Sequence, residues 1–217
     1  MTTTTCTPTD RTTRSLLGYG IVAGPVYVLV GLAQALTRDG FDISRHAWSL
    51  LTNGDLGWIQ IANFIAAGLM TAAAAVGLRR SLPVGTARKW APPLILTYGV
   101  SLVGAGLFRA DPAQGFPVGT PETPAVTWHG MLHLLIGGIG FFCLIAACFV
   151  LAAHFARGGR RALARFSRIT GVAFLAAFAG IASGSHGPTT LAFLVAVVVV
   201  WAWLTTISLL FFRTTAV

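Results

Sequence analysis

Two histidines stand four positions apart at the start of a long apolar run. His129 and His133 follow Trp128 in the segment T-W-H-G-M-L-H-L-L, residues 127–135. On a helix, positions four apart lie one above the other, so the two imidazoles share a face. A pair of this kind can bind zinc or transfer protons, and it can equally form hydrogen bonds between helices.

A zinc site at His129 and His133 needs further ligands. His46, His186 and Asp111 carry suitable donor atoms, although the glutamate of an H-E-x-x-H motif is missing. Zinc is therefore one candidate cofactor. Haem is a weaker candidate because its two axial ligands lie on opposite faces of the macrocycle, and only His133 with His186 could meet that requirement.

Other polar residues are expected at the same depth as the histidines. We expect Asp111 to pair with His129, and Asn63 or Gln60 to pair with His133, because ionisable side chains inside a membrane need partners. Together these side chains would line a polar pocket that opens to the outside. The predicted site has His129, His133 and Asp111 as its catalytic residues, and His46, Asn63, Gln60, Arg109, His186, Asp42 and Ser49 as its ligand-binding residues.

The predicted first outer loop shows helical spacing over residues 41–53. Asp42, His46, Ser49 and Asn53 would form one polar stripe, with apolar residues on the opposite side. We predict a short amphipathic helix that lies on the membrane surface or folds over the bundle as a lid. A hydrolytic triad of Asp42, His46 and Ser49 is disfavoured, because a triad requires converging side chains rather than a line along one helix.

The composition indicates an integral membrane protein. Of the 217 residues, 55% are hydrophobic and only 10% are charged, whereas soluble domains carry about a quarter charged residues. The sequence predicts an all-α bundle of six transmembrane helices, with residues 1–14 as a disordered cytoplasmic tail and 15–213 as the transmembrane domain. The predicted spans are 15–37, 58–78, 91–109, 128–153, 166–184 and 189–212.

The basic residues predict the orientation. The net charge of +9 does not indicate nucleic-acid binding, because the basic residues fall in short clusters between apolar runs. Twelve of them lie on one side of the predicted spans and three on the other, so the positive-inside rule places both termini in the cytoplasm. The excess of arginine over lysine is typical of a GC-rich bacterium, which makes the bacterial inner membrane the expected location. The three on the outer side are Arg38, Arg45 and Arg109.

The first span also resembles a signal peptide. Ala33-Gln34-Ala35 has the pattern of a cleavage site after a basic start and an apolar run. The run is longer than a usual signal-peptide core and is interrupted by Gly24-Pro25. We therefore expect the span to be retained.

Three motifs carry a resemblance to a known family. They are F-D-I-S-R-H-A-W-S-L-L-T-N-G-D-L-G-W-I-Q, L-F-R-A-D-P at 107–112, and W-H-G-M-L-H at 128–133. In this order they resemble the bacterial and archaeal membrane family known as domain of unknown function 998, over roughly residues 15 to 212. The resemblance implies a multi-span membrane protein without an established activity.

The chain is more loosely similar to membrane hydrolases of the ceramidase and adiponectin-receptor type. Those enzymes hold zinc with S-x-x-x-H, an aspartate and H-x-x-x-H. This chain has H-x-x-x-H at 129–133 and Asp111, but Ser44 and His46 lack the required spacing and a seventh span is missing.

Three functions follow from these patterns. The first is an outward-facing pocket of histidine and aspartate that binds a lipid or a small molecule. The second is a zinc-dependent intramembrane hydrolase that acts on a lipid-like substrate. The third is a structural or partner-binding membrane subunit. Membrane lipid is an expected partner in all three, and nucleic acid in none.

Overall fold

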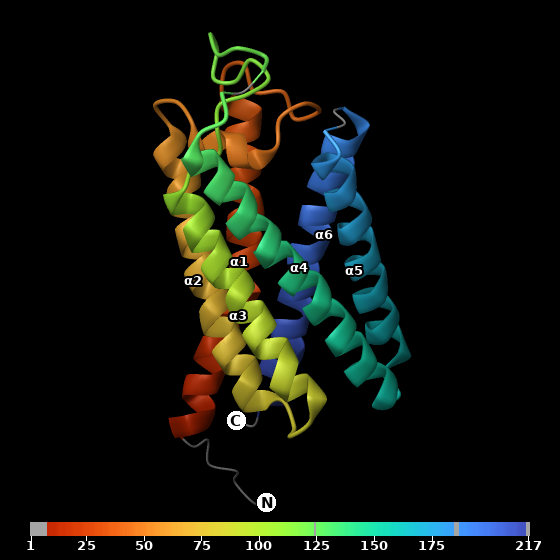
Figure 1. The fold of residues 1–217 in the computed structure, drawn as a ribbon. Helices are drawn as coiled ribbons and strands as arrows, with labels where there is room; N and C mark the ends of the chain where they lie inside the picture. Colours follow the sequence, from red (N-terminus) through yellow and green to blue (C-terminus); the bar gives the residue numbers. More distant parts are fainter. Residues whose placement is uncertain (1–7, 124, 185–186, 216–217) are drawn as a thin grey trace, which may run out of the picture.

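The computed structural model describes residues 8–123, 125–184 and 187–215. Six long helices run side by side, and each is long and apolar enough to cross a membrane (Figure 1). The prediction of an all-α bundle of six spans is therefore confirmed. The helices are α1 (Pro8–Thr37), α2 (Gly57–Ser81), α3 (Thr86–Leu107), α4 (Trp128–Arg157), α5 (Arg161–Ala182) and α6 (Pro188–Thr214), with a short 3-10 helix η1 (Trp48–Thr52) between α1 and α2.

Helix α1 begins earlier than predicted. Residues 8–14, which were expected to belong to a disordered tail, are helical. Asp10 lies in the first turn, where a carboxylate complements the helix dipole. The Arg14 guanidinium lies 4.5 Å from the centroid of the Phe212 ring, which attaches this end of α1 to α6. The predicted tail at residues 1–7 lies outside the described residues.

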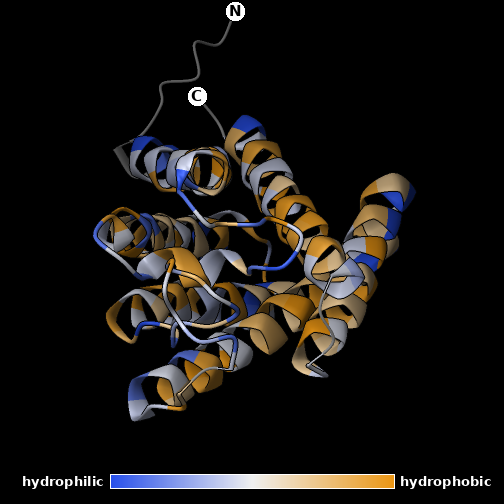
Figure 2. Cartoon of the chain, turned by 90° about the horizontal axis from the view of Figure 1, so that it is seen from above, coloured by the Kyte–Doolittle hydropathy of each residue, from blue (hydrophilic) through white to orange (hydrophobic). Residues whose placement is uncertain are grey.

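The helices contact one another in sequence order. Each helix packs against the next one in the chain, and α6 also packs against α1, so the contacts close into a ring. Helix α1 starts and α6 ends at the same end of the bundle (Figure 1). Apolar residues cover the length of the helices, while hydrophilic residues gather mainly at helix ends and in the loops (Figure 2).

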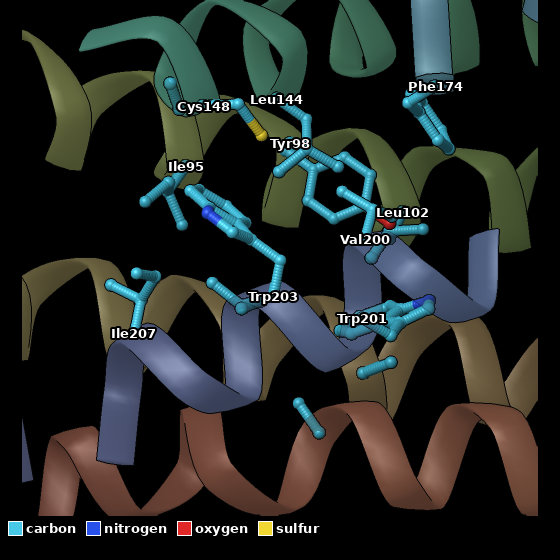
Figure 3. Packing of buried hydrophobic residues seen from close by; sticks show 14 of the residues in the cluster. Ile95, Tyr98, Leu102, Leu144, Cys148, Phe174, Val200, Trp201, Trp203 and Ile207 are labelled. Carbon is cyan, nitrogen blue, oxygen red and sulfur yellow. The ribbon is translucent and has the colours of Figure 1, made fainter. Parts of the chain in front are cut away.

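Aromatic side chains fill the centre of the bundle. Tyr27 of α1 stacks on Trp201 of α6 with ring centroids 4.9 Å apart, and Tyr98 of α3 lies 5.9 Å from Trp201. Trp203 of α6 contacts α5, where its indole Nε1 donates a hydrogen bond to Ser167 Oγ at 2.9 Å. Side chains from α3, α4, α5 and α6 meet in this cluster (Figure 3).

Helices α2 and α3 approach each other closely at a pair of glycines. A Cβ atom at position 68 would lie 2.5 Å from the Gly99 carbonyl oxygen, and one at position 99 would lie 2.8 Å from the Gly68 carbonyl oxygen. The two backbones are therefore in direct contact, as small residues allow in membrane bundles. This contact holds α2 beside α3.

Two loops lie at the end of the bundle opposite the start of α1 and the end of α6, and they form a cap over α1, α2 and α3 (Figure 1). The cap consists of residues 38–56, 108–123 and 125–127. Phe116 lies buried within it, in edge-on contact with Phe41 at 5.1 Å. The predicted outer-loop helix is present, but only as the five residues of η1, and it folds onto the bundle: Trp48 packs against the Tyr27 ring at 5.9 Å.

The predicted polar stripe over residues 41–53 does not form. The Asp42 carboxylate accepts hydrogen bonds from the backbone N–H and the hydroxyl of Ser44, and the Asp42 N–H donates to His46 Nδ1 at 2.8 Å. These local bonds offer the backbone an alternative to helix, which is why Asp and Ser favour turns. Asp42 is consequently exposed while His46 and Asn53 are buried.

Candidate ligand-binding site

His129 and His133 lie in different environments. His129 is exposed at the start of α4, where its ring contacts Trp128 at 3.6 Å and Phe108 at 6.0 Å. His133, one turn further along, is buried, with its ring edge towards Phe64. The two side chains share a helix face but do not share surroundings.

His133 binds the end of α3. Its Nδ1 lies 2.8 Å from the Phe108 carbonyl oxygen and 3.1 Å from that of Ala105, so Nδ1 must carry the hydrogen and donate to both. The last carbonyls of a helix lack partners within the helix, and His133 supplies one from α4. The expected pairing of His133 with Asn63 or Gln60 is therefore wrong.

Asp111 binds the start of α4. Its carboxylate accepts the Thr127 N–H at 2.9 Å and the Thr127 hydroxyl at 2.5 Å, at a helix end that favours negative charge. Gly130 permits this approach, because a Cβ at that position would overlap the carboxylate. Asp111 thus pairs with Thr127, and the expected pairing with His129 is wrong.

The described residues do not assemble the predicted metal ligands. No three His, Cys, Asp or Glu side chains within the described ranges are arranged to hold a metal ion. His186, a predicted ligand for zinc or haem, lies outside those ranges. The roles predicted for His129, His133 and Asp111 gain no geometric support, because His133 and Asp111 are occupied by structural hydrogen bonds.

His46 joins the two loops of the cap. Its Nδ1 accepts a hydrogen bond from the backbone N–H of Asp42, and its Nε2 donates one to the Gln114 carbonyl oxygen at 2.9 Å. Within the described residues the Ser49 hydroxyl forms no hydrogen bond with Asp42 or His46, so the three side chains do not form a triad. His46 therefore has a structural position in the cap.

The hydrogen bonds from Ser44 also favour the ionised form of Asp42 in the cap. They hold the pKa of the Asp42 carboxyl below its usual value. A depressed pKa means that this contribution to stability is present at neutral pH and is lost as the pH falls through the folded pKa.

Arg38 is an anchor of the cap that the sequence did not single out. Its Nη1 donates to the Leu51 carbonyl oxygen at 2.6 Å, and its Nη2 donates to that of Asn53 at 2.5 Å. The guanidinium also lies 5.0 Å from the Phe116 ring centroid. Burial lowers the pKa of Arg38, and the Asp55 carboxylate opposes that change. By contrast, the predicted ligand residue Arg109 is exposed, without a hydrogen bond to the described residues.

Beneath the cap lies a cluster of three buried amides, which we call the amide cluster: Gln34, Gln60 and Asn63. Gln34 Nε2 donates to Gln60 Oε1 at 2.8 Å across α1 and α2, and Asn63 Nδ2 lies 3.3 Å from the same oxygen. Asn63 Nδ2 also donates to the Tyr27 carbonyl oxygen at 3.1 Å. Gln60 is completely buried, and the other two are about 5% exposed.

Within the described part of the chain, each member of the amide cluster retains one polar atom without a hydrogen-bond partner. These atoms are Gln34 Oε1, Gln60 Nε2 and Asn63 Oδ1, two acceptors and one donor. The indole Nε1 of Trp48, whose ring packs against the Tyr27 ring, is likewise buried without a partner among the described residues. The unpartnered atoms therefore include both donors and acceptors of hydrogen bonds, and the cluster contains no nucleophile or proton-transfer group.

The sequence predicted two of the three amides. Gln60 and Asn63 stand three apart, so they share a face of α2. Gln34 is a single polar residue near the end of α1, and nothing in its own helix shows that it faces α2. Its position within the apolar run, where a polar side chain needs a partner, is the only signal that could have identified it.

Comparison with known proteins gives one match. A family model described as "Protein of unknown function (DUF998)" matches residues 21–210. Neither the curated proteins nor the solved structures contain a match.

Proposed function

The chain belongs to the family of proteins of unknown function DUF998, and from its own geometry we propose that it is a membrane protein that binds a small uncharged hydrogen-bonding molecule at the amide cluster. The ligand is either a free molecule or the uncharged polar part of a lipid. This proposal keeps the predicted ligand-binding function but moves the site from the histidines to the amides beneath the cap.

The unpartnered atoms of the amide cluster carry the proposal. An amide group buried without a hydrogen bond costs roughly 2 kcal/mol or more. Three such atoms lie together on side chains that already contact one another, and they combine donor and acceptor. A guest with complementary groups would satisfy them in one step. Their arrangement therefore supports binding more than it supports packing alone.

The chemistry of the amide cluster favours an uncharged guest. None of the hydrogen bonds to its side chains comes from a charged group. Arg38 follows Gln34 by one helical turn, but its guanidinium donates to the carbonyl oxygens of η1 and its C-terminal neighbour. A charged guest would therefore lack a counter-charge in a buried site, which is costly.

Small probes test the amide cluster directly. We expect the full chain, purified in detergent micelles, to show a saturable rise in thermal midpoint with acetamide, ethylene glycol or monooleoylglycerol. At a probe concentration 100 times Kd, the stabilisation should be about 2.7 kcal/mol. The Gln60→Leu and Asn63→Leu variants should lose this rise because they remove the atoms that bind the probe.

Thr97→Val provides the control for these variants. Thr97 is exposed on α3, and its hydroxyl donates to its own helix at Pro93, so this variant should respond to the probes as the unmodified chain does. An unchanged response in Gln60→Leu would show that the probes act elsewhere. The absence of a saturable response to all three probes would contradict the proposed function.

We also propose that the cap faces away from the cytoplasm in a bacterial inner membrane. The distribution of basic residues, twelve against three, supports this orientation. Alkaline phosphatase fused after Gly119 in the cap should be active, and phosphatase fused after Gly85 between α2 and α3 should be inactive. Green fluorescent protein at the same positions should give the opposite pattern. Activity of the phosphatase at Gly85 alone would reverse the proposed orientation.

A further inference from the structure

An arginine-rich segment covers the end of α4 and the start of α5. Five arginines occur between positions 157 and 168, and all five are exposed. The sequence contains no aspartate or glutamate after Glu122, so this half of the chain offers no carboxylate side chain to pair with them. The five residues are Arg157, Arg160, Arg161, Arg165 and Arg168.

Two of the other basic residues at this end of the bundle have aromatic partners. Arg14 lies over the Phe212 ring, and Lys89 Nζ lies 5.3 Å from the centroid of the Trp90 ring. The guanidinium groups of Arg165 and Arg168 have neither a ring nor a hydrogen-bond acceptor within the described ranges. Their charge is available to a ligand.

Three of the arginines lie along one line of α5, which we call the α5 basic stripe: Arg161, Arg165 and Arg168. Spacings of four and three residues place them on one helix face. The same line continues towards the middle of the bundle with Val172 and Leu175, which are 56% and 40% exposed. A charged segment thus passes directly into an apolar one on the outer surface of α5.

The apolar part of α5 is shorter than the hydrocarbon core of a bilayer. Only Ile169–Ala182 of α5 is free of charged residues, and 14 residues of helix span about 21 Å. The hydrocarbon core of a bilayer is about 30 Å thick. Arg165 and Arg168 must therefore lie at the depth of the headgroups or deeper, with their stems along the apolar surface.

We propose that the α5 basic stripe binds the phosphate of an anionic phospholipid, whose acyl chains lie against Val172 and Leu175. The planar guanidinium forms paired hydrogen bonds to phosphate oxygens. A lipid fits better than a soluble phosphate, because the apolar continuation of the stripe and its depth match an acyl chain below a headgroup. This inference does not depend on the function proposed for the amide cluster.

Lipid retention tests the α5 basic stripe. The full chain is placed in nanodiscs of equimolar phosphatidylcholine and phosphatidylglycerol, and the lipids that remain bound after release are counted by native mass spectrometry. We expect enrichment of phosphatidylglycerol. The double variant Arg165→Gln/Arg168→Gln should reduce the enrichment about fivefold for each arginine removed.

Arg79→Gln/Arg80→Gln is the matched control, since it removes the same charge from exposed positions at the end of α2. The apolar part of α2 is long enough for the bilayer, so these two arginines lie at its surface, and their loss should preserve the enrichment. If the Arg165→Gln/Arg168→Gln variant does not fold in phosphatidylcholine, the two single variants replace it under the same criterion.

Three results would overturn the proposal. The first is an equal retention of both lipids by the unmodified chain. The second is an equal loss of enrichment in both double variants, which would assign it to general surface charge. The third is complete displacement of phosphatidylglycerol by inorganic phosphate, which would assign the stripe to a soluble anion.

Discussion

Gly68→Ala should lower the free energy of unfolding by about 3 kcal/mol. The new methyl group would lie 2.5 Å from the Gly99 carbonyl oxygen and 3.0 Å from the Val103 backbone nitrogen. These are backbone atoms, which cannot move aside as a flexible side chain can, so α2 and α3 must separate. Titration of the purified protein with sodium dodecyl sulfate in mixed micelles would measure the loss.

Gly137→Ala is the control for that variant. No heavy atom lies within 4 Å of a Cβ built at position 137, and alanine favours helix over glycine by about 1 kcal/mol. This substitution should leave the stability unchanged or raise it slightly. Equal losses at positions 68 and 137 would contradict the prediction, because the loss at position 68 could then not be assigned to the contact between α2 and α3.

Arg38→Leu should release the cap and reduce stability by about 3 kcal/mol. Two hydrogen bonds from a charged donor are lost, and such bonds contribute roughly 1.5–3 kcal/mol each when buried. The carbonyl oxygens of Leu51 and Asn53 lose their hydrogen-bond donor, and the Phe116 ring loses its contact with the guanidinium cation. Hydrogen exchange should therefore become faster in η1 while the middles of the helices stay protected.

Arg109→Leu removes the same charge from the same end of the bundle. Because Arg109 is exposed and makes no hydrogen bond to the described residues, exchange in η1 should not change. Arg38→Lys should give an intermediate effect, since one ammonium group cannot donate to both carbonyl oxygens in the geometry of a fork. Protection of η1 that survives Arg38→Leu would mean that the cap is held by its other contacts.

The six spans could be predicted because they depend on one physical requirement. A helix that crosses hydrocarbon must be apolar over about 20 residues, and the sequence shows that length directly. The ends of the spans depend on weaker local terms. At α1 the helix includes residues as early as Pro8, because Arg14 packs on Phe212 of α6, a contact between opposite ends of the sequence.

The partners of the site residues could not be predicted in the same way. Helical spacing places His133 on a face, but the residues opposite that face depend on how α4 rotates and crosses α3. Its partners are backbone carbonyl groups, which no sequence pattern marks. Gln34 was overlooked for the same reason, since its position opposite Gln60 depends on the packing of two helices.

The outer loop shows a different limit of sequence patterns. Periodicity alone predicts a helix over residues 41–53, but the side chains of Asp42 and His46 bind the local backbone and restrict the helix to η1. Arg38 counted only as an exception to the positive-inside rule. Its position on the cap side is explained by the two carbonyl oxygens that it binds.

The order of contacts around the bundle bears on how the protein is assembled during translation. Because every helix packs against its predecessor, each new span can join a partner that has already been inserted. The seam between α1 and α6 is the exception, because it cannot form until α6 has been inserted. Until α6 is inserted, the faces of α1 and α5 that it covers therefore stay open to the bilayer.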